Sequence, residues 1–287
     1  MNRKFLVVML FMITSILYSF EEGFIWGLRA NFNGSLTLPS ISQEDLYKLS
    51  AAYMKGTVGY TMDGEAELGY LFGAERWFGK EKSDFSKFSG MSLYVSIGVG
   101  TGFSGMVAGN TLQVGTNSAV SAQMFMNVNY KPVISFGIGS KLYLLESRMA
   151  IGLQLGGKVI ADTSPEYLAY SDMDKTFSDL GVTLPEMSEI VVTDFMKKNM
   201  NPVMFSLKLM LEYNQPINDR VEVVLGIYTR FNIYKPKYIT MPDTLLGLIN
   251  TAKKTQNAAE FNPQTPLNSY YMNSLDFGVT LGLQFRG

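Results

Sequence analysis

The strongest constraint on this chain is a strict alternation of large apolar residues with small or polar ones. Its longest run, at 274–285, places apolar residues at alternate positions: Leu275, Phe277, Val279, Leu281, Leu283 and Phe285. Comparable runs span 24–33, 91–100 and 134–139. Successive side chains of a β-strand point to opposite faces of the sheet. The sequence therefore predicts an all-β protein whose strands each carry one apolar face.

The second face of these strands decides between a soluble barrel and a membrane barrel. A soluble, lipocalin-like barrel would place its apolar face inside, whereas a membrane barrel would place it outside. The polar face here is mostly Gly, Ser, Asn and Gln, while a solvated sheet surface is usually crowded with Lys, Glu and Thr. Small residues fit the interior of a closed tube, and runs of about ten residues cross a bilayer at a tilt. The pattern favours a transmembrane antiparallel up-and-down β-barrel.

Aromatic residues support the same orientation. They make up 13% of the chain and gather near the ends of the runs, as the interfacial girdles of membrane barrels do. The set comprises Trp26, Tyr60, Tyr70, Phe72, Trp77, Tyr130, Tyr213, Phe231, Tyr234, Tyr271 and Phe285. Only 17% of the residues are charged and 47% are hydrophobic, which argues against a disordered chain.

Turn signals set the expected number of strands. Single-chain bacterial barrels have even counts, with short periplasmic turns and longer outer loops. Short turns are expected at 146–148 and 214–220, and long outer loops at about 161–202 and 235–271. A first count of nine becomes ten because Asp63-Gly64 is a favoured two-residue hairpin turn. The predicted strands, with eight as the alternative number, lie near 23–38, 52–62, 65–78, 91–104, 118–130, 133–145, 149–160, 203–213, 221–234 and 272–286.

The first 19 residues have the pattern of a cleaved export signal. Arg3 and Lys4 precede an almost wholly apolar run at 5–17. That run is shorter than the roughly 20 residues of a membrane-spanning helix, but it suits a secretory signal peptide. We expect residues 1–19 to be the signal peptide and residues 20–287 to form the barrel with its long loops.

Three segments between the expected strands have the end signals of short amphipathic helices. They begin at Ser42, Pro185 and Pro242, with acidic residues or Pro in the first turn. Helices in the two long loops would place four large apolar residues over the mouth of the barrel: Ile190, Phe195, Leu248 and Ile249. These residues either pack against each other and the barrel rim, or border a vestibule for a small apolar ligand.

Alternate residues of a strand point to the same face, and on this basis several charged residues fall on the inward face. The set holds five basic and five acidic residues: Arg29, Glu65, Glu67, Lys141, Lys158, Lys208, Glu212, Glu222, Arg230 and Asp276. Charges inside a narrow barrel must be paired or hydrated, because an unpaired buried charge costs on the order of several kcal/mol. A balanced set is typical of a structural ion-pair network that fills the lumen. The functional alternative is a narrow polar passage with little charge selectivity.

Two absences exclude most familiar chemistry. The chain contains no Cys and no His, so it lacks disulfides, thiolate ligands, and the most common general base and metal ligand. The net charge of −1 gives no basis for nucleic-acid binding. The glycine-rich stretch at 98–102 continues a strand and has no helix behind it, unlike a phosphate-binding loop. No catalytic residue, cofactor or metal site is expected.

These features resemble the small outer-membrane β-barrel proteins, including the OmpA and OmpW types. The resemblance covers residues 23–287 and rests on the export signal, the alternating strands and a last strand ending in an aromatic residue, Phe285. It implies an outer-membrane location, with the lipid bilayer and the outer-membrane assembly machinery as partners. The chain departs from the family by continuing with Arg286 and Gly287. Enzymes of this class place His at the catalytic centre, so the resemblance implies a protein that is not an enzyme.

Two functions of different class fit this pattern. The first is the passage or partition of small or apolar molecules across the outer membrane. The alternative is a surface-exposed structural or adhesive barrel that acts through its loops at 161–202 and 235–271. A continuous lumen wider than a water molecule would favour the first.

Overall fold

The structure is a computed structural model in which nine stretches of the chain are described. They are residues 22–48, 53–73, 88–114, 118–145, 148–160, 163–171, 203–218, 220–235 and 271–287. The expected signal peptide, the helices expected from Pro185 and Pro242, and the four apolar residues expected at the mouth lie outside these stretches.

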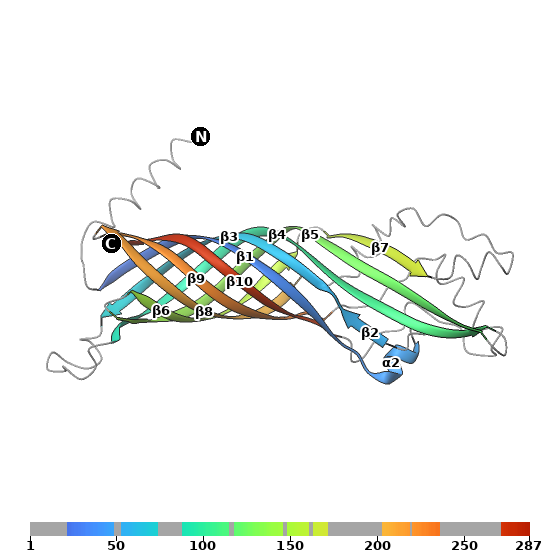
Figure 1. Cartoon of the computed structure of the whole chain (residues 1–287). Coiled ribbons are helices and arrows are strands. Elements are labelled where there is room, and N and C mark those ends of the chain that lie inside the picture. The colour runs from blue at the N-terminus through green and yellow to red at the C-terminus, as the bar shows by residue number, and fades with distance from the viewer. Residues whose placement is uncertain are drawn as a thin grey trace.

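Within these residues, eight antiparallel strands close into a barrel (Figure 1). In chain order they are β1 (Gly23–Ser40), β3 (Val58–Gly73), β4 (Phe88–Val114), β5 (Ser118–Leu144), β6 (Met149–Ile160), β8 (Val203–Asn218), β9 (Val221–Ile233) and β10 (Tyr271–Arg286). Each strand pairs with the next in this series, and β1 pairs with β10 to close the ring. The pairing of Ile25 with Arg286 defines the terminal end of the barrel, and we call the opposite end the loop end.

Two further strands join the sheet outside the ring. β2 (Tyr53–Gly56) pairs with β4, and β7 (Thr163–Ser171) pairs with β5 at the start of a segment expected to be a loop. β4 and β5 continue past the barrel as a long hairpin, because residues 105–114 still pair with residues 118–127. Figure 1 shows this projecting hairpin extending from the loop end, with β2 and β7 beside it.

The ring uses the alternative count of eight strands rather than ten, for two local reasons. Asp63 and Gly64 do not form a hairpin turn, because β3 runs straight through them and pairs with β1 and β4 on its two sides. Asp63 continues the inward positions of β3, and its carboxylate lies 3.4 Å from Arg230. The break predicted between 130 and 133 is a shift in pairing within a continuous β5. The described sheet as a whole has ten strands, since β2 and β7 join it.

The two faces of the barrel wall differ as the alternation predicts. Outward positions carry large apolar side chains that are strongly exposed, and Ile97 and Ile138 are each 63% exposed. Inward positions are mostly polar or small and are almost fully buried, as Asn31 and Ser92 are. An aliphatic surface of this extent is unfavourable in water and favourable against lipid tails. The prediction of a transmembrane barrel with its apolar face outward is confirmed.

Aromatic side chains gather on the outward face near the terminal end. Trp26 stacks on Phe285 with ring centroids 3.9 Å apart, and Phe24 meets the edge of Tyr70 at 5.4 Å. These residues belong to β1, β3 and β10, which are adjacent in the ring. Aromatic rings at one end of the apolar surface fit the membrane–water interface.

One helix lies within the described residues, α2 (Gln43–Lys48), between β1 and β2. It begins where the sequence predicts. The backbone N–H of Asp45 donates to Ser42 Oγ at 3.1 Å, and the N–H of Leu46 donates to the Ser42 carbonyl at 2.9 Å. Ser42 is therefore the N-cap, and the acidic residues of the first turn favour the positive end of the helix dipole.

Candidate functional site in the barrel lumen

The structure places all ten of the charged residues expected inside the barrel in the lumen, each at most 8% exposed. They come from seven of the eight ring strands, and β4 instead contributes the buried Ser92 and Ser96. Inward positions from opposite walls of a narrow barrel lie within reach of one another. The charges consequently pair between strands that are far apart in the sequence.

Four of these side chains form a closed cluster in the terminal half of the barrel. We call it the charged quartet: Arg29, Glu67, Lys141 and Glu212. Arg29 lies 2.9 Å from Glu67 and 3.3 Å from Glu212. Lys141 lies 2.7 Å from Glu67 and 3.1 Å from Glu212. Because each cation contacts both carboxylates, the cluster is neutral and every buried charge is compensated directly.

A second cluster lies nearer the loop end and centres on Glu65. The Glu65 carboxylate accepts hydrogen bonds from Lys208 at 2.9 Å, Gln154 at 2.9 Å and Asn31 at 3.0 Å. The Lys208 ammonium also lies 4.8 Å from the centre of the Tyr228 ring, within cation–π range. Three donors on one carboxylate compensate for most of its lost hydration.

The terminal end of the lumen is closed by a polar bridge and an apolar cluster. Gln284 accepts a hydrogen bond from Arg29 at 3.2 Å and donates one to Glu222 at 3.1 Å. Arg286 lies 2.8 Å from the same Glu222 carboxylate. The apolar cluster beside this bridge consists of Ile25, Leu71, Tyr143 and Ala150.

The ion pairs nearest the loop end are longer. Arg230 Nη1 lies 3.4 Å from Asp63 Oδ2, and Lys158 Nζ lies 3.5 Å from Asp276 Oδ2. Asp276 takes its shorter hydrogen bonds from Ser35 Oγ at 2.7 Å and from the side-chain amide of Asn232 at 2.8 Å. The cations here are held less tightly than those of the charged quartet.

Side chains fill the described lumen and leave no water-wide passage through the quartet. A water-filled passage would leave its lining residues accessible, yet Lys141 and Glu212 are 1% and 2% exposed. The geometry therefore favours a structural ion-pair network over a polar passage at this level of the barrel.

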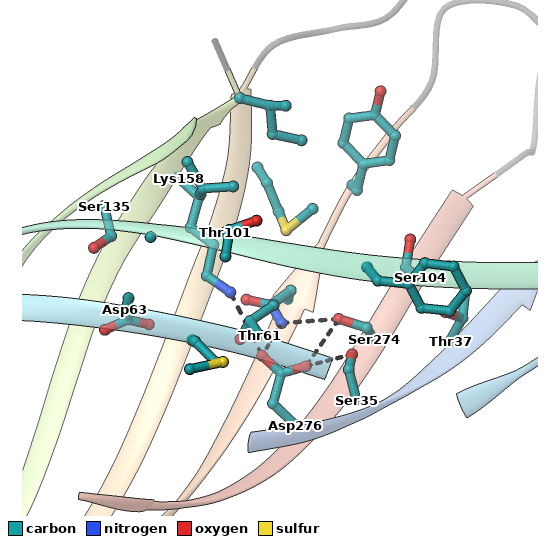
Figure 2. A pocket seen from close by; sticks show the side chains of 18 of the residues that line it. Ser35, Thr37, Thr61, Asp63, Thr101, Ser104, Ser135, Lys158, Ser274 and Asp276 are labelled. Atoms are coloured by element: carbon teal, nitrogen blue, oxygen red, sulfur yellow. Dashed lines mark hydrogen bonds and ion pairs between the residues drawn. The ribbon is translucent and has the colours of Figure 1, made fainter. Parts of the chain in front are cut away.

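A cavity lies at the loop end of the lumen, beside the Lys158–Asp276 pair (Figure 2). Its volume is about 40 Å³, and all eight ring strands contribute residues to its wall. Hydroxyl groups from Ser35, Thr37 and Thr61 line it together with the charged pair. A molecule of a few heavy atoms fits a space of this volume.

Sequence reasoning missed several members of the network. Asp63, expected in a turn, and Arg286, expected at the end of the last strand and not among the inward charges, both form ion pairs in the barrel. Gln154 and Gln284 were passed over because only charged residues were considered. The signal for Asp63 was present, since it shares the parity of Glu65 and Glu67 on the same strand.

Other kinds of site find no support in the described part of the chain. The residues expected at the mouth, Ile190, Phe195, Leu248 and Ile249, lie outside it. Within it, no group of three or more acidic side chains is placed to hold a metal ion. No helix among the described residues is long and apolar enough to cross a membrane.

A closed antiparallel ring with an apolar outer face and a charged, filled lumen defines a membrane-spanning β-barrel protein. The fold of the described residues is an eight-stranded antiparallel β-barrel. No known protein family matches the sequence, and no curated protein does.

Three solved structures are similar to the chain over most of their length. Neisserial surface protein A (NspA) is 6% identical, with a TM-score of 0.27, over 91% of this chain and 97% of its own. OprG of Pseudomonas aeruginosa is 8% identical, with a TM-score of 0.29, over 93% and 98%. The outer-membrane protease OmpT of Escherichia coli is 8% identical, with a TM-score of 0.34, over 96% and 100%.

Proposed function

We propose that this protein is an outer-membrane barrel with a closed lumen, and that it acts at the cell surface through the segments beyond its loop end. The observation that carries the proposal is the filled lumen, where the charged quartet and the Glu65 cluster are held by direct ion pairs. Opening a passage would separate several buried pairs, and removing one partner from such a pair costs about 3–5 kcal/mol. In this proposal the barrel is an anchor and its lumen a rigid core.

The projecting hairpin supplies a surface for such a role. Residues 105–114 and 118–127 pair beyond the barrel, and β2 and β7 widen this part of the sheet. The connection between Asn218 and Val221 at the terminal end is short, whereas long connections precede β8 and β10, which begin at the loop end. Bacterial barrels keep short turns in the periplasm and long loops outside. The loop end therefore faces the exterior in this proposal.

The remaining parts of the proposal follow from this topology. Residues 1–19 direct export and are removed, the assembly machinery inserts the barrel, and the lipid bilayer contacts its apolar face. The protein is not an enzyme in this proposal, because the chain has no His or Cys to act as general base or thiol nucleophile.

A second candidate function is the passage or partition of small or apolar molecules. The cavity at the loop end favours it, because this cavity offers a place where a small molecule could enter the lumen. A solute that continued towards the terminal end would still meet the Glu65 cluster and the charged quartet. Passage therefore requires a rearrangement that the closed-lumen proposal does not.

Conductance separates the two functions. The purified wild-type protein in planar bilayers should give no stable open-channel current, because its lumen is filled. A double variant, Arg29→Ala with Glu212→Ala, removes one charge of each sign from the quartet and should show channel events. Channel events from this variant would show that the protein inserts into the bilayer under the conditions used for the wild type. Stable channels or liposome swelling by the wild type would reject the closed lumen in favour of passage.

The assigned orientation can be tested by labelling, since the chain contains no Cys of its own. A single Gln113→Cys change places a thiol near the tip of the projecting hairpin, and an Arg220→Cys change places one in the short turn before β9. On intact cells a membrane-impermeant maleimide should label the first and leave the second unlabelled until the outer membrane is broken. The reverse pattern would contradict action at the cell surface.

A further inference from the structure

The loop-end cavity contains polar groups whose hydrogen bonding is incomplete. Thr37 and Asn232 both line it and are 3% and 1% exposed. Among the described residues, Thr37 Oγ1 and Asn232 Oδ1 have no hydrogen-bond partner. Buried polar atoms without partners are unfavourable and uncommon in native structures. Two of them line this cavity, where a bound molecule would supply the missing partners.

Lys158 is the cation of this cavity, and most of its hydrogen-bonding capacity is unused. Its side chain is 6% exposed, and Nζ makes a single contact within the described structure, at 3.5 Å from Asp276 Oδ2. An ammonium group has three N–H donors. Figure 2 shows Lys158 extending from the wall into the cavity towards Asp276. Lys141 and Lys208, deeper in the lumen, are instead held at 2.7 Å and 2.9 Å by carboxylates.

Asp276 does not depend on Lys158 for its hydrogen bonds. Ser35 Oγ donates to Asp276 at 2.7 Å, the Asn232 amide at 2.8 Å, and Ser274 Oγ at 3.3 Å. If Lys158 turned towards a second anion, Asp276 would keep these three partners. The ammonium can therefore turn part of its hydrogen-bonding capacity to a ligand while Asp276 keeps three hydrogen bonds.

The side chains of Lys158 and Asn232 meet at one carboxylate oxygen of Asp276, because Lys158 Nζ and the Asn232 amide both lie against Oδ2. A ligand beside them would meet an N–H donor from Lys158 and a carbonyl acceptor from Asn232. One wall of the same cavity is apolar, where Ile160 packs with Val133 and Met204.

We propose that the loop-end cavity binds a small hydroxy-monocarboxylate. Lys158 donates to the ligand carboxylate, the ligand hydroxyl donates to Asn232 Oδ1, and a short carbon chain packs on Ile160, Val133 and Met204. Thr37 Oγ1 completes the polar contacts. A cavity of about 40 Å³ limits the ligand to a few heavy atoms, since one water needs about 10–15 Å³. The inference does not depend on whether the barrel conducts.

Three probes of nearly the same size test the chemistry of the site. Carbon-13-labelled lactate, propionate and lactamide are titrated into the purified protein in detergent micelles, and saturable chemical-shift changes give the affinities. Lactate should bind at least about tenfold more tightly than lactamide, because the charge-assisted contact to Lys158 is lost. Lactate should also bind at least about threefold more tightly than propionate, because propionate lacks the hydroxyl. Equal affinities for lactate and lactamide, or no saturable binding, would overturn the proposal.

Variants show whether binding takes place in this cavity. Lys158→Met should remove the preference for lactate over lactamide, whereas Lys131→Met, at an exposed position of β5, should leave it unchanged. Heat-modifiable gel migration reports whether each variant is folded. If Lys158→Met does not fold, Met204→Phe and Thr37→Val are tested instead. Met204→Phe fills the cavity and Thr37→Val removes the unpartnered hydroxyl, so both should weaken lactate binding. Unchanged lactate binding in these folded variants would place the ligand elsewhere and refute the proposal.

Discussion

The two halves of the lumen are built from the same residue types but differ in how tightly the charges are held. In the charged quartet each cation contacts two carboxylates, at distances of 2.7–3.3 Å. At the loop end Lys158 and Arg230 each contact one carboxylate, at 3.5 Å and 3.4 Å. The terminal half therefore holds each cation by two carboxylates, whereas the loop end holds each cation by one longer contact.

The difference follows from the length of the inward side chains in each region. Near the quartet, long charged side chains meet across the barrel and are almost fully buried. Near the loop end the inward residues are smaller, and Ser35, Thr37 and Thr61 leave space between opposite walls. Short hydroxyl side chains cannot span a barrel, so a cavity forms where they cluster. A lumen can thus combine a structural end with a binding end.

The largest expected effect comes from breaking the quartet. Glu212→Ala leaves Arg29 and Lys141 facing the single carboxylate of Glu67, so two buried cations lose half of their compensation. We expect the free energy of unfolding to fall by about 3–5 kcal/mol. Urea unfolding of the protein in lipid vesicles measures it. A loss below about 1 kcal/mol, the value typical of an exposed pair, would show that the quartet is not a structural core.

A smaller but still large effect is expected on the outer wall at the height of the quartet. Leu281 faces outward, 54% exposed, and pairs with Ala30 next to Arg29. Leu281→Arg should cost about 2–4 kcal/mol, because the charge would lie in the hydrocarbon layer. Unfolding in vesicles is compared with Leu281→Phe as the apolar control. If both variants were equally stable, this face would not contact lipid and the inward and outward assignments would be reversed.

The fold was largely accessible from the sequence because its decisive signal is local. Alternation along 274–285 assigns one face of β10 without knowledge of its neighbours. The strand number was less accessible, since Asp63-Gly64 has the composition of a hairpin turn. Only the pairing of β3 with both β1 and β4 shows that the strand continues. The Asp-Gly pair favours a turn, but Asp63 lies on the inward face of β3 and pairs there with Arg230. Because Arg230 is far away in the sequence, no local pattern reveals this contact.

The site was less predictable because its geometry depends on opposite walls of the barrel. Parity leads to Glu67, Lys141 and Glu212 one at a time, but not to the contacts among them. Those contacts follow from the register of β3, β5 and β8 around the ring, which no local pattern encodes. The cavity is harder still, since it depends on where opposing side chains are too short to meet. Its unpartnered Thr37 and Asn232 have no signature in the sequence.

At the loop end the comparison predicts a weaker effect. Lys158→Met removes one long contact to Asp276, which retains its hydrogen bonds from Ser35, Asn232 and Ser274. The expected loss is about 1–2 kcal/mol in the free energy of unfolding, below that of Glu212→Ala. The same vesicle assay measures both variants side by side. Equal losses would mean that the two halves of the lumen are equally rigid.

The smallest effect is expected at Thr37, and its sign is the informative part. The Thr37 hydroxyl is buried without a described hydrogen-bond partner, so the empty site leaves its lost hydration uncompensated. Thr37→Val replaces the hydroxyl by a methyl group of nearly the same size. In the absence of ligand, the variant should be as stable as the wild type or more stable by up to about 1 kcal/mol.

The free energy of unfolding of the wild type and of Thr37→Val is measured with and without lactate. Lactate should stabilise the wild type more than the variant, because stabilisation by a ligand scales with its affinity for the folded state. A variant clearly less stable than the wild type without ligand would show that the Thr37 hydroxyl is already satisfied, and Thr37 would then not be available to a ligand at the loop end.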